Sequence, residues 1–251
     1  MILTLIAPQS ISRHCRAILW FAVIHITLVL LIFGSSSVAQ ISYPVDKGVP
    51  QTLAKWRAEN YSNVRYKLNL TIEKKAPTLK GSIEISLESK TPRIILDWRK
   101  IKGHEKLSKI SNVSINGKKL RWNPRQPGAP NSKHPLYEIY NEHIYINDGA
   151  KVGKNVIKLD FESPILTSGS AITRYIDKED GSEYIYSLFV PSDASSAFPV
   201  FDQPDLKARF SLIVTAPIEW KIISNSPVKT QIELYNEHCE TKLVRSNSNS
   251  R

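Results

Sequence analysis

The sequence has 251 residues, a formal net charge of +11 and only two cysteines. So few cysteines exclude a small disulfide scaffold, which needs several bridges. The basic excess is spread along the chain and is not gathered in one block rich in aromatic residues, so we expect no nucleic-acid partner. The charge fits a solvated basic face or attraction to an acidic envelope.

Residues 1–39 differ in composition from the rest of the chain. Arg13 and Arg16 precede an almost uninterrupted apolar run over 17–33, and small residues lead up to Ala39. This order predicts a signal peptide over 1–39 and therefore an exported protein, periplasmic or extracellular. The alternative is an uncleaved N-terminal anchor, because an apolar run of this length is at the lower limit for crossing a bilayer. We expect contact with a membrane only if the segment is not cleaved.

The leading segment, 40–62, contains helix-forming residues over 51–61 and predicts a short helix there. The pattern changes at Val64, where apolar and polar residues begin a strict alternation that runs to Ile72. Such a period of two predicts a strand with one buried face.

The same period or other strand signals recur along 63–235. Asn116-Gly117 is a pair suited to a tight hairpin turn within 113–122. Further strands are expected at 83–87, 93–98, 139–147, 157–161, 183–191, 209–216 and 220–224. Many short strands without alternating helices predict an all-β fold, an antiparallel β-sandwich that is open and saddle-like, with a short leading helix.

The last segment, 236–251, is expected to be a polar tail, with at most a strand over 241–244. It ends in alternating Ser and Asn, which are too polar for a core. We interpret this tail as the point at which a longer protein is truncated.

A crossover rich in proline and phenylalanine connects two strands that are expected to be buried. Pro204 suits the first turn of a short helix capped by Asp202, with Asp205 near its positive end. A structural corner is the favoured interpretation, and a role for Asp202 or Asp205 in facing a ligand is the alternative. The motif residues are Phe198, Pro199, Phe201, Asp202, Gln203, Pro204, Asp205, Lys207 and Ala208.

These residues carry a resemblance. Residues 168–228 resemble the N-terminal domain of the M1 (gluzincin) zinc aminopeptidases, the aminopeptidase N group, through Thr173-Arg174-Tyr175, the corner motif and the Ser224-Asn225 pair. Residues 53–68 match the opening helix and first strand of that domain more loosely.

The resemblance implies that the full-length family removes N-terminal residues from peptides with one zinc ion, held by an H-E-x-x-H helix and a distant Glu. This sequence contains neither H-E-x-x-H nor the amine-binding G-x-M-E-N, since its single methionine is Met1. We therefore expect no catalytic, metal-binding or substrate-binding residue and no cofactor in this chain. Peptide substrates would belong only to the full-length enzyme.

The resemblance also shows a departure. Many relatives have a Gln and a Glu before the corner, at the places of Leu188 and Val190, so this domain is expected to supply no charged anchor for a peptide amine. We expect three histidines to be ordinary surface or edge residues without a role in binding or catalysis, namely His134, His143 and His238.

Three hypotheses follow. The first is a truncated or split N-terminal domain of an exported M1 aminopeptidase, inactive alone, whose partner is the missing catalytic domain or a complementary chain. The second is a secreted β-sandwich module that binds peptides or proteins. The third is hydrolysis by this chain itself, which the missing motifs disfavour.

Overall fold

The computed structural model describes residues 45–124, 136–236 and 239–249. The segment 1–39 expected to be a signal peptide or anchor lies outside them, as do His134 and His238. None of the helices in these described ranges has the length and apolar character that crossing a bilayer requires. Residues 41–251 form one compact unit.

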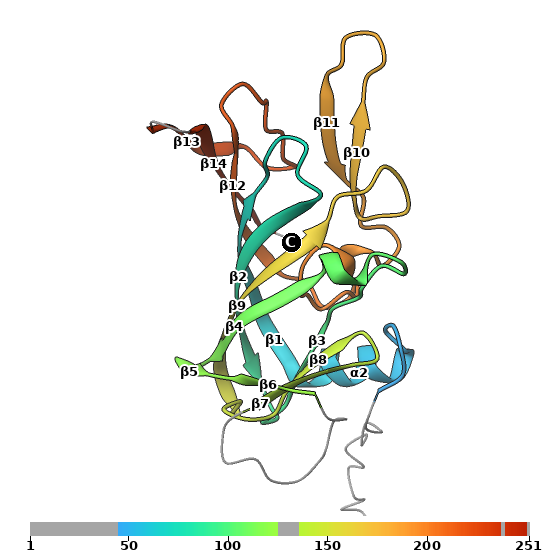
Figure 1. The fold of residues 1–251 in the computed structure, drawn as a ribbon. Helices are drawn as coiled ribbons and strands as arrows, with labels where there is room; N and C mark the ends of the chain where they lie inside the picture. The colour runs from blue at the N-terminus through green and yellow to red at the C-terminus, as the bar shows by residue number, and fades with distance from the viewer. Residues whose placement is uncertain (1–44, 125–135, 237–238, 250–251) are drawn as a thin grey trace, which may run out of the picture. The chain divides into compact units, whose positions relative to one another are not determined.

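Strands make up most of the regular secondary structure of the described chain (Figure 1). An α-helix, α2, spans Gln51–Asn60, and two 3-10 helices, η1 and η2, span Glu105–Leu107 and Ala194–Ser196. The first seven strands are β1 (Tyr61–Thr71), β2 (Thr78–Ser89), β3 (Ile94–Asp97), β4 (Lys109–Ile115), β5 (Lys118–Lys119), β6 (Arg121–Asn123) and β7 (Leu136–Tyr140). The remaining ones are β8 (His143–Ile146), β9 (Gly153–Pro164), β10 (Ile172–Ile176), β11 (Glu183–Ser187), β12 (Arg209–Pro217), β13 (Val228–Asn236) and β14 (Cys239–Asn249).

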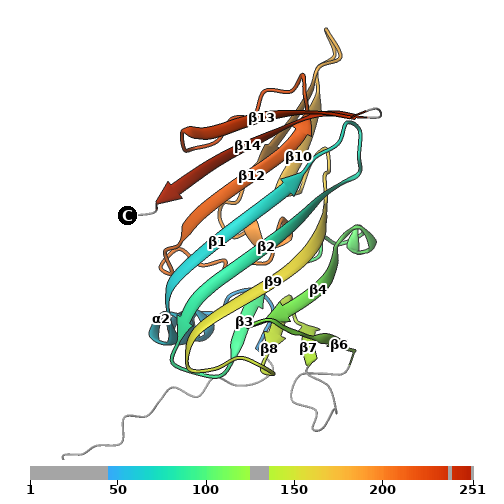
Figure 2. The same cartoon turned by 90° about the vertical axis from the view of Figure 1, so that its left-hand side faces the viewer.

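Three sheets result. The largest has eight strands in the order β13-β14-β12-β1-β2-β9-β4-β5, a second has the order β3-β8-β7-β6, and a third is the β10–β11 hairpin (Figure 2). The predicted all-β class and the leading helix are confirmed. The sheets are mixed and not purely antiparallel, because β1 pairs in parallel with β12 and β6 in parallel with β7.

The core lies on the face of the large sheet that the alternation marks as apolar. In β1, Val64, Tyr66 and Leu68 are buried while the residues between them are exposed. Antiparallel pairing places Ile83 of β2 opposite Leu159 of β9, and both are almost fully buried. Trp98, which follows β3, packs edge-to-face with Phe161 across this core, with 6.2 Å between the ring centroids. Burial of such side chains is the main stabilising contribution to the domain.

Two tight turns shape the strand ends. The predicted Asn116-Gly117 turn is confirmed, with φ of 52° and 82° and Ile115 paired to Lys118. The single strand expected over 139–147 is wrong, because the chain reverses at Asn141-Glu142, where both residues have positive φ. No glycine marks this turn, which is why the sequence pattern concealed it.

Two further expectations are wrong near the end of the chain. Residues 220–224 have no regular secondary structure and form no strand. The stretch expected to be a polar tail contains β14, which lies between β12 and β13 in the large sheet. Val244 and Ser246 of β14 are buried. A strand rich in small polar residues can therefore occupy an interior position of the sheet.

Candidate functional site

The Phe- and Pro-rich corner packs against the helix and the first strand of the domain. Phe198 and Phe201 are 5% and 4% exposed, and Pro199 is also buried. The ring of Phe201 lies 5.1 Å from that of Tyr61, and its backbone N–H donates to the Tyr66 hydroxyl at 3.0 Å. The corner is thereby fastened to β1 by both apolar and polar contacts.

A buried charged network lies directly beneath this corner. Arg57 of α2 is fully buried and donates through Nη1 and Nη2 to both carboxylate oxygens of Asp97, at 2.8 and 2.6 Å. Nη2 also donates to the Ile95 carbonyl at 2.8 Å. Asp97 ends β3 and accepts the backbone N–H of Asp202 at 2.8 Å. The Asp97 carboxylate therefore connects α2, the four-stranded sheet and the corner through hydrogen bonds.

His143 is the third charged or titratable member of the network. Its Nδ1 lies 2.8 Å from Asp97 Oδ1 and its Nε2 lies 2.9 Å from the Asp46 carbonyl oxygen. The expectation of a surface or edge position for His143 is wrong, because its side chain is fully buried. Since both ring nitrogens are occupied, His143 offers no free position to a metal ion.

The electrostatics of the network favour an ionised Asp97. Burial alone would raise the pKa of Asp97, but the charge of Arg57 and the hydrogen bonds from His143, Arg57 and the Asp202 N–H lower it below its ordinary value. Burial likewise raises the pKa of Tyr61 and of Tyr66, so both hydroxyls stay protonated. Their hydroxyl groups serve as hydrogen-bonding supports for the corner.

The polar residues of the motif differ in their positions. Gln203 is buried, and its Nε2 donates to the Ala54 carbonyl and to Asp205 Oδ1, each at 3.0 Å. The short helix expected at Pro204 is absent from the described corner, which forms a turn there. Asp202 accepts the N–H of Ser195 in η2 at 2.9 Å and does not cap a helix after it. Pro204, Asp205 and Lys207 are exposed, and Ala208 is 9% exposed.

A cavity of about 290 Å³ lies beside the network, with Asp97, Arg99, His143 and Asp202 in its lining. Burial raises the pKa of Asp202 there. Arg99 is paired with Asp193. Within the described residues, no group of three His, Cys, Asp or Glu side chains is placed to hold a metal ion. The described residues around the cavity therefore do not fit a zinc site. Their charged side chains form hydrogen bonds or ion pairs with other residues of the domain.

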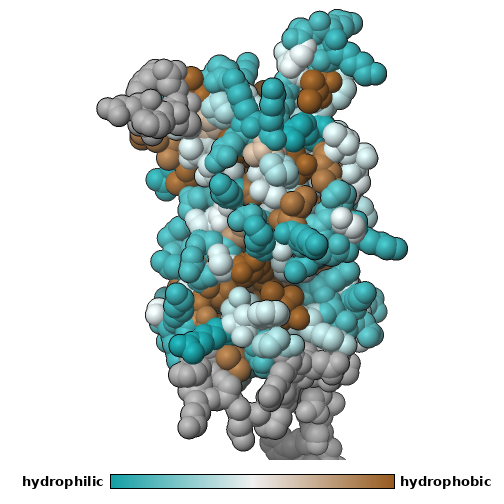
Figure 3. Space-filling view, in the orientation of Figure 1, coloured by the Kyte–Doolittle hydropathy of each residue, from teal (hydrophilic) through white to brown (hydrophobic). Residues whose placement is uncertain are grey.

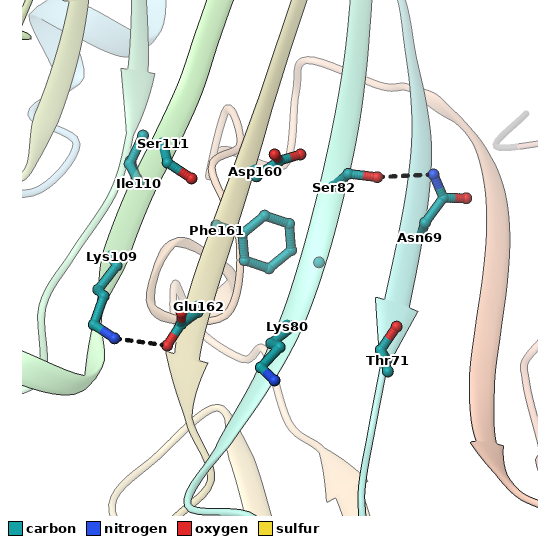
Figure 4. A pocket seen from close by; sticks show the side chains of 11 residues that line it. Asn69, Thr71, Lys80, Ser82, Lys109, Ile110, Ser111, Asp160, Phe161 and Glu162 are labelled. Carbon is teal, nitrogen blue, oxygen red and sulfur yellow. Dashed lines mark hydrogen bonds and ion pairs between the residues drawn. The ribbon is translucent and has the colours of Figure 1, made fainter. Parts of the chain in front are cut away.

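A wider hollow of about 590 Å³ lies on the opposite, polar face of the large sheet (Figure 4). Its polar side chains are largely paired with each other across the strands. Asn69 donates to Ser82 at 3.0 Å, and Lys109 pairs with Glu162 at 3.0 Å. With these side chains paired to one another, the face has the character of a solvated sheet surface.

The β10–β11 hairpin before the corner carries an exposed apolar surface. Tyr175, Tyr184 and Tyr186 share one face of the hairpin and are 51%, 51% and 53% exposed. Leu188 and Val190 continue along the chain with 59% and 73% exposure. The expectation that the strand over 183–191 is buried is wrong. Figure 3 shows a small brown, apolar patch on this otherwise mostly hydrophilic hairpin.

Comparison with known proteins gives a consistent assignment. Residues 62–250 match the peptidase M1 N-terminal domain, so the chain belongs to the M1 peptidase family through that domain. It is 34% identical over 90 residues to an aminopeptidase N of Streptomyces lividans, covering 36% of this chain and 10% of that one. It is 26% identical over 198 residues to an aminopeptidase A of Gloydius brevicauda, covering 76% of this chain and 20% of that one.

Solved structures agree on the fold. An M1 zinc metallopeptidase from Deinococcus radiodurans superposes with a TM-score of 0.53 at 19% identity, over 75% of this chain and 39% of that one. The chain thus spans only a tenth to a quarter of the length of the curated relatives it matches. The resemblance drawn from the corner motif is confirmed.

Proposed function

We propose that this chain acts as the non-catalytic N-terminal domain of an exported M1-type zinc aminopeptidase. In that protein, a separate catalytic domain would bind zinc and release the N-terminal residue of a peptide. The observation that carries the proposal is the family match over 62–250, in a chain whose described residues hold no metal-binding cluster. Alone, the chain is then inactive.

The exposed face of the β10–β11 hairpin supports a docking role. A two-stranded hairpin is only marginally stable by itself, and three tyrosines on one of its faces are an unusual exposure for a monomer. Arg174 and Glu183 pair at 2.6 Å on the other face of the hairpin. We place the contact with the catalytic domain on the tyrosine face. Leu188 and Val190 bring no charge to it, so recognition of a peptide amine would fall to the other domain.

A direct experiment measures zinc content and aminopeptidase activity of purified residues 41–251. The proposal expects no stoichiometric zinc and no release of a fluorophore from aminoacyl substrates. Zinc-dependent hydrolysis that survives repurification would overturn it. Adding the catalytic domain of an M1 relative as a separate chain tests docking, and a Y184S/Y186S variant should weaken that association while leaving the melting temperature of the domain unchanged.

The same exposed face supports a second candidate, a secreted β-sandwich module that binds peptides or proteins. Exposed aromatic side chains are typical of binding surfaces. This candidate predicts a monomer in solution that binds apolar peptides through the tyrosine face without any catalytic domain. If the domain instead aggregates, binds no peptide, and becomes soluble in the Y184S/Y186S variant, the result would favour the first proposal, an N-terminal domain that lacks its catalytic domain.

A further inference from the structure

A second surface combines positive charge with exposed apolar side chains, at the end of the domain formed by β5 and β6. Lys118, Lys119 and Arg121 are all exposed, and Trp122 beside them is 58% exposed. None of these three cations has a salt bridge within the described residues. The sequence from Gly117 to Pro135 contains no Asp or Glu, so no neighbour along the chain neutralises them.

The loop before β9 extends the same surface. Asn116 Nδ2 donates to the Gly149 carbonyl at 2.9 Å, which ties this loop to the β4–β5 turn. The loop brings two more exposed cations, Lys151 and Lys154, and an exposed Val152 at 65%. We name these seven residues the basic end: Lys118, Lys119, Arg121, Trp122, Lys151, Val152 and Lys154.

The nearest acids do not cancel this charge. Asp148 accepts the backbone N–H of Leu136 at 2.7 Å, and Glu88 lies opposite Lys154 in the β2–β9 pairing. Glu138 of β7 is also close, because Asn123 beside Trp122 donates to its carboxylate at 3.0 Å, but five cations against these three carboxylates still leave a positive excess. A solvated basic face would explain the lysines, but it would not explain a Trp and a Val exposed among them.

We infer that the basic end is a docking surface for an anionic lipid bilayer. Lysine and arginine near such a surface are each attracted to acidic headgroups, and tryptophan favours the boundary between headgroups and acyl chains. Trp122 and Val152 supply the apolar contacts, and the cations supply the charge complementarity. The positive charge could also attract nucleic acid. Binding of a single strand, however, uses several aromatic side chains on which successive bases stack, and the basic end has one aromatic side chain, Trp122.

The first described residue contacts the sheet that carries Trp122. Val45, the first described residue, lies against the β7–β8 hairpin, where its N–H donates to Tyr145 and its carbonyl accepts from Asn141. This hairpin is in the same four-stranded sheet as β6 (Figures 1 and 2). Val45 therefore contacts the sheet to which Trp122 belongs.

The test uses residues 41–251, which form a compact unit with its own core. Sedimentation with vesicles of phosphatidylcholine containing about 30% phosphatidylglycerol should pull down the protein at about 0.1 M salt, and pure phosphatidylcholine vesicles should not. Each cation contributes roughly fivefold to partitioning, so K118Q/K119Q/R121Q should lower it about 100-fold. W122A should weaken binding and remove the fluorescence shift caused by the vesicles.

The matched control is K100Q/K102Q/K106Q, which removes the same charge from the exposed loop around η1. It should reduce partitioning only a few-fold through the net charge. Equal losses in the two triple variants would overturn the inference, as would failure to bind anionic vesicles. Tighter binding to single-stranded DNA than to vesicles, with the same dependence on the basic end, would assign the surface to nucleic acid and also overturn it. Melting temperatures of all variants establish that they fold.

Discussion

The Arg57–Asp97 pair should be the most sensitive point of the domain. In R57M, a side chain of similar length replaces the guanidinium and leaves the Asp97 carboxylate buried, with 4% of its side chain exposed. Breaking one partner of such a buried pair costs about 3–5 kcal/mol, and the Ile95 carbonyl also loses its donor. For a domain of this size, each kcal/mol lowers the melting temperature by about 2–4 °C, so we expect a fall of about 6–20 °C.

The assay is thermal and urea unfolding of residues 41–251 followed by circular dichroism. K67M is the matched control, because Lys67 forms an ion pair of similar length, 2.7 Å with Glu84, but its side chain is 67% exposed. It should cost no more than about 1 kcal/mol. R57M/D97L, which removes both charges, should cost less than the sum of the two single variants. Strict additivity, or a cost of R57M below about 1 kcal/mol, would refute the reasoning.

The remaining predictions concern pH and packing. Because the pKa of Asp97 is lowered in the fold, its contribution to stability is full above the ordinary Asp pKa of about 4 and is lost as pH falls below it; the acid branch of a pH–stability curve should flatten in R57M. The pKa of Asp202 is raised by burial, so its ionised form is disfavoured in the fold at neutral pH; D202N should raise the melting temperature at pH 7, with no gain at about pH 3, and a decrease at pH 7 would contradict this. A Cβ added at Gly81 would lie 2.4 Å from Phe161 Cζ, so G81A should cost about 1–3 kcal/mol, and G81A/F161L should cost less than the sum of its parts in the same unfolding assay.

The strands with one buried face could be predicted from the sequence because burial imposes the period of two. Val64 to Leu68 and Ile157 to Phe161 follow that pattern in the structure. The Asn116-Gly117 turn was equally readable, since both residues tolerate positive φ. The turn at Asn141-Glu142 was hidden, because a positive φ at Glu142 is set by the packing of the β7–β8 hairpin and has no local sequence signal.

The buried network could not be predicted in the same way. Arg57, Asp97 and His143 are far apart in the sequence, and each has a polar side chain that ordinarily faces solvent. Their burial follows from mutual pairing across α2, β3 and β8, a property of tertiary structure. The local sequence offers one indication: Arg57 and Asp97 directly follow Trp56 and Leu96, which are apolar and buried.

The β10–β11 hairpin is the most informative difference between expectation and structure. Its sequence predicts a buried strand, because a strand that is apolar on both faces normally lies inside a core. In the structure Tyr184, Tyr186, Leu188 and Val190 are each more than half exposed, although the corner that follows them is packed to a few per cent. A chain that buries Phe198 and Phe201 this well does not leave four large apolar residues exposed for want of a core. The contact with a catalytic domain that we propose would cover this surface, and the Y184S/Y186S variant tests whether these exposed side chains carry it.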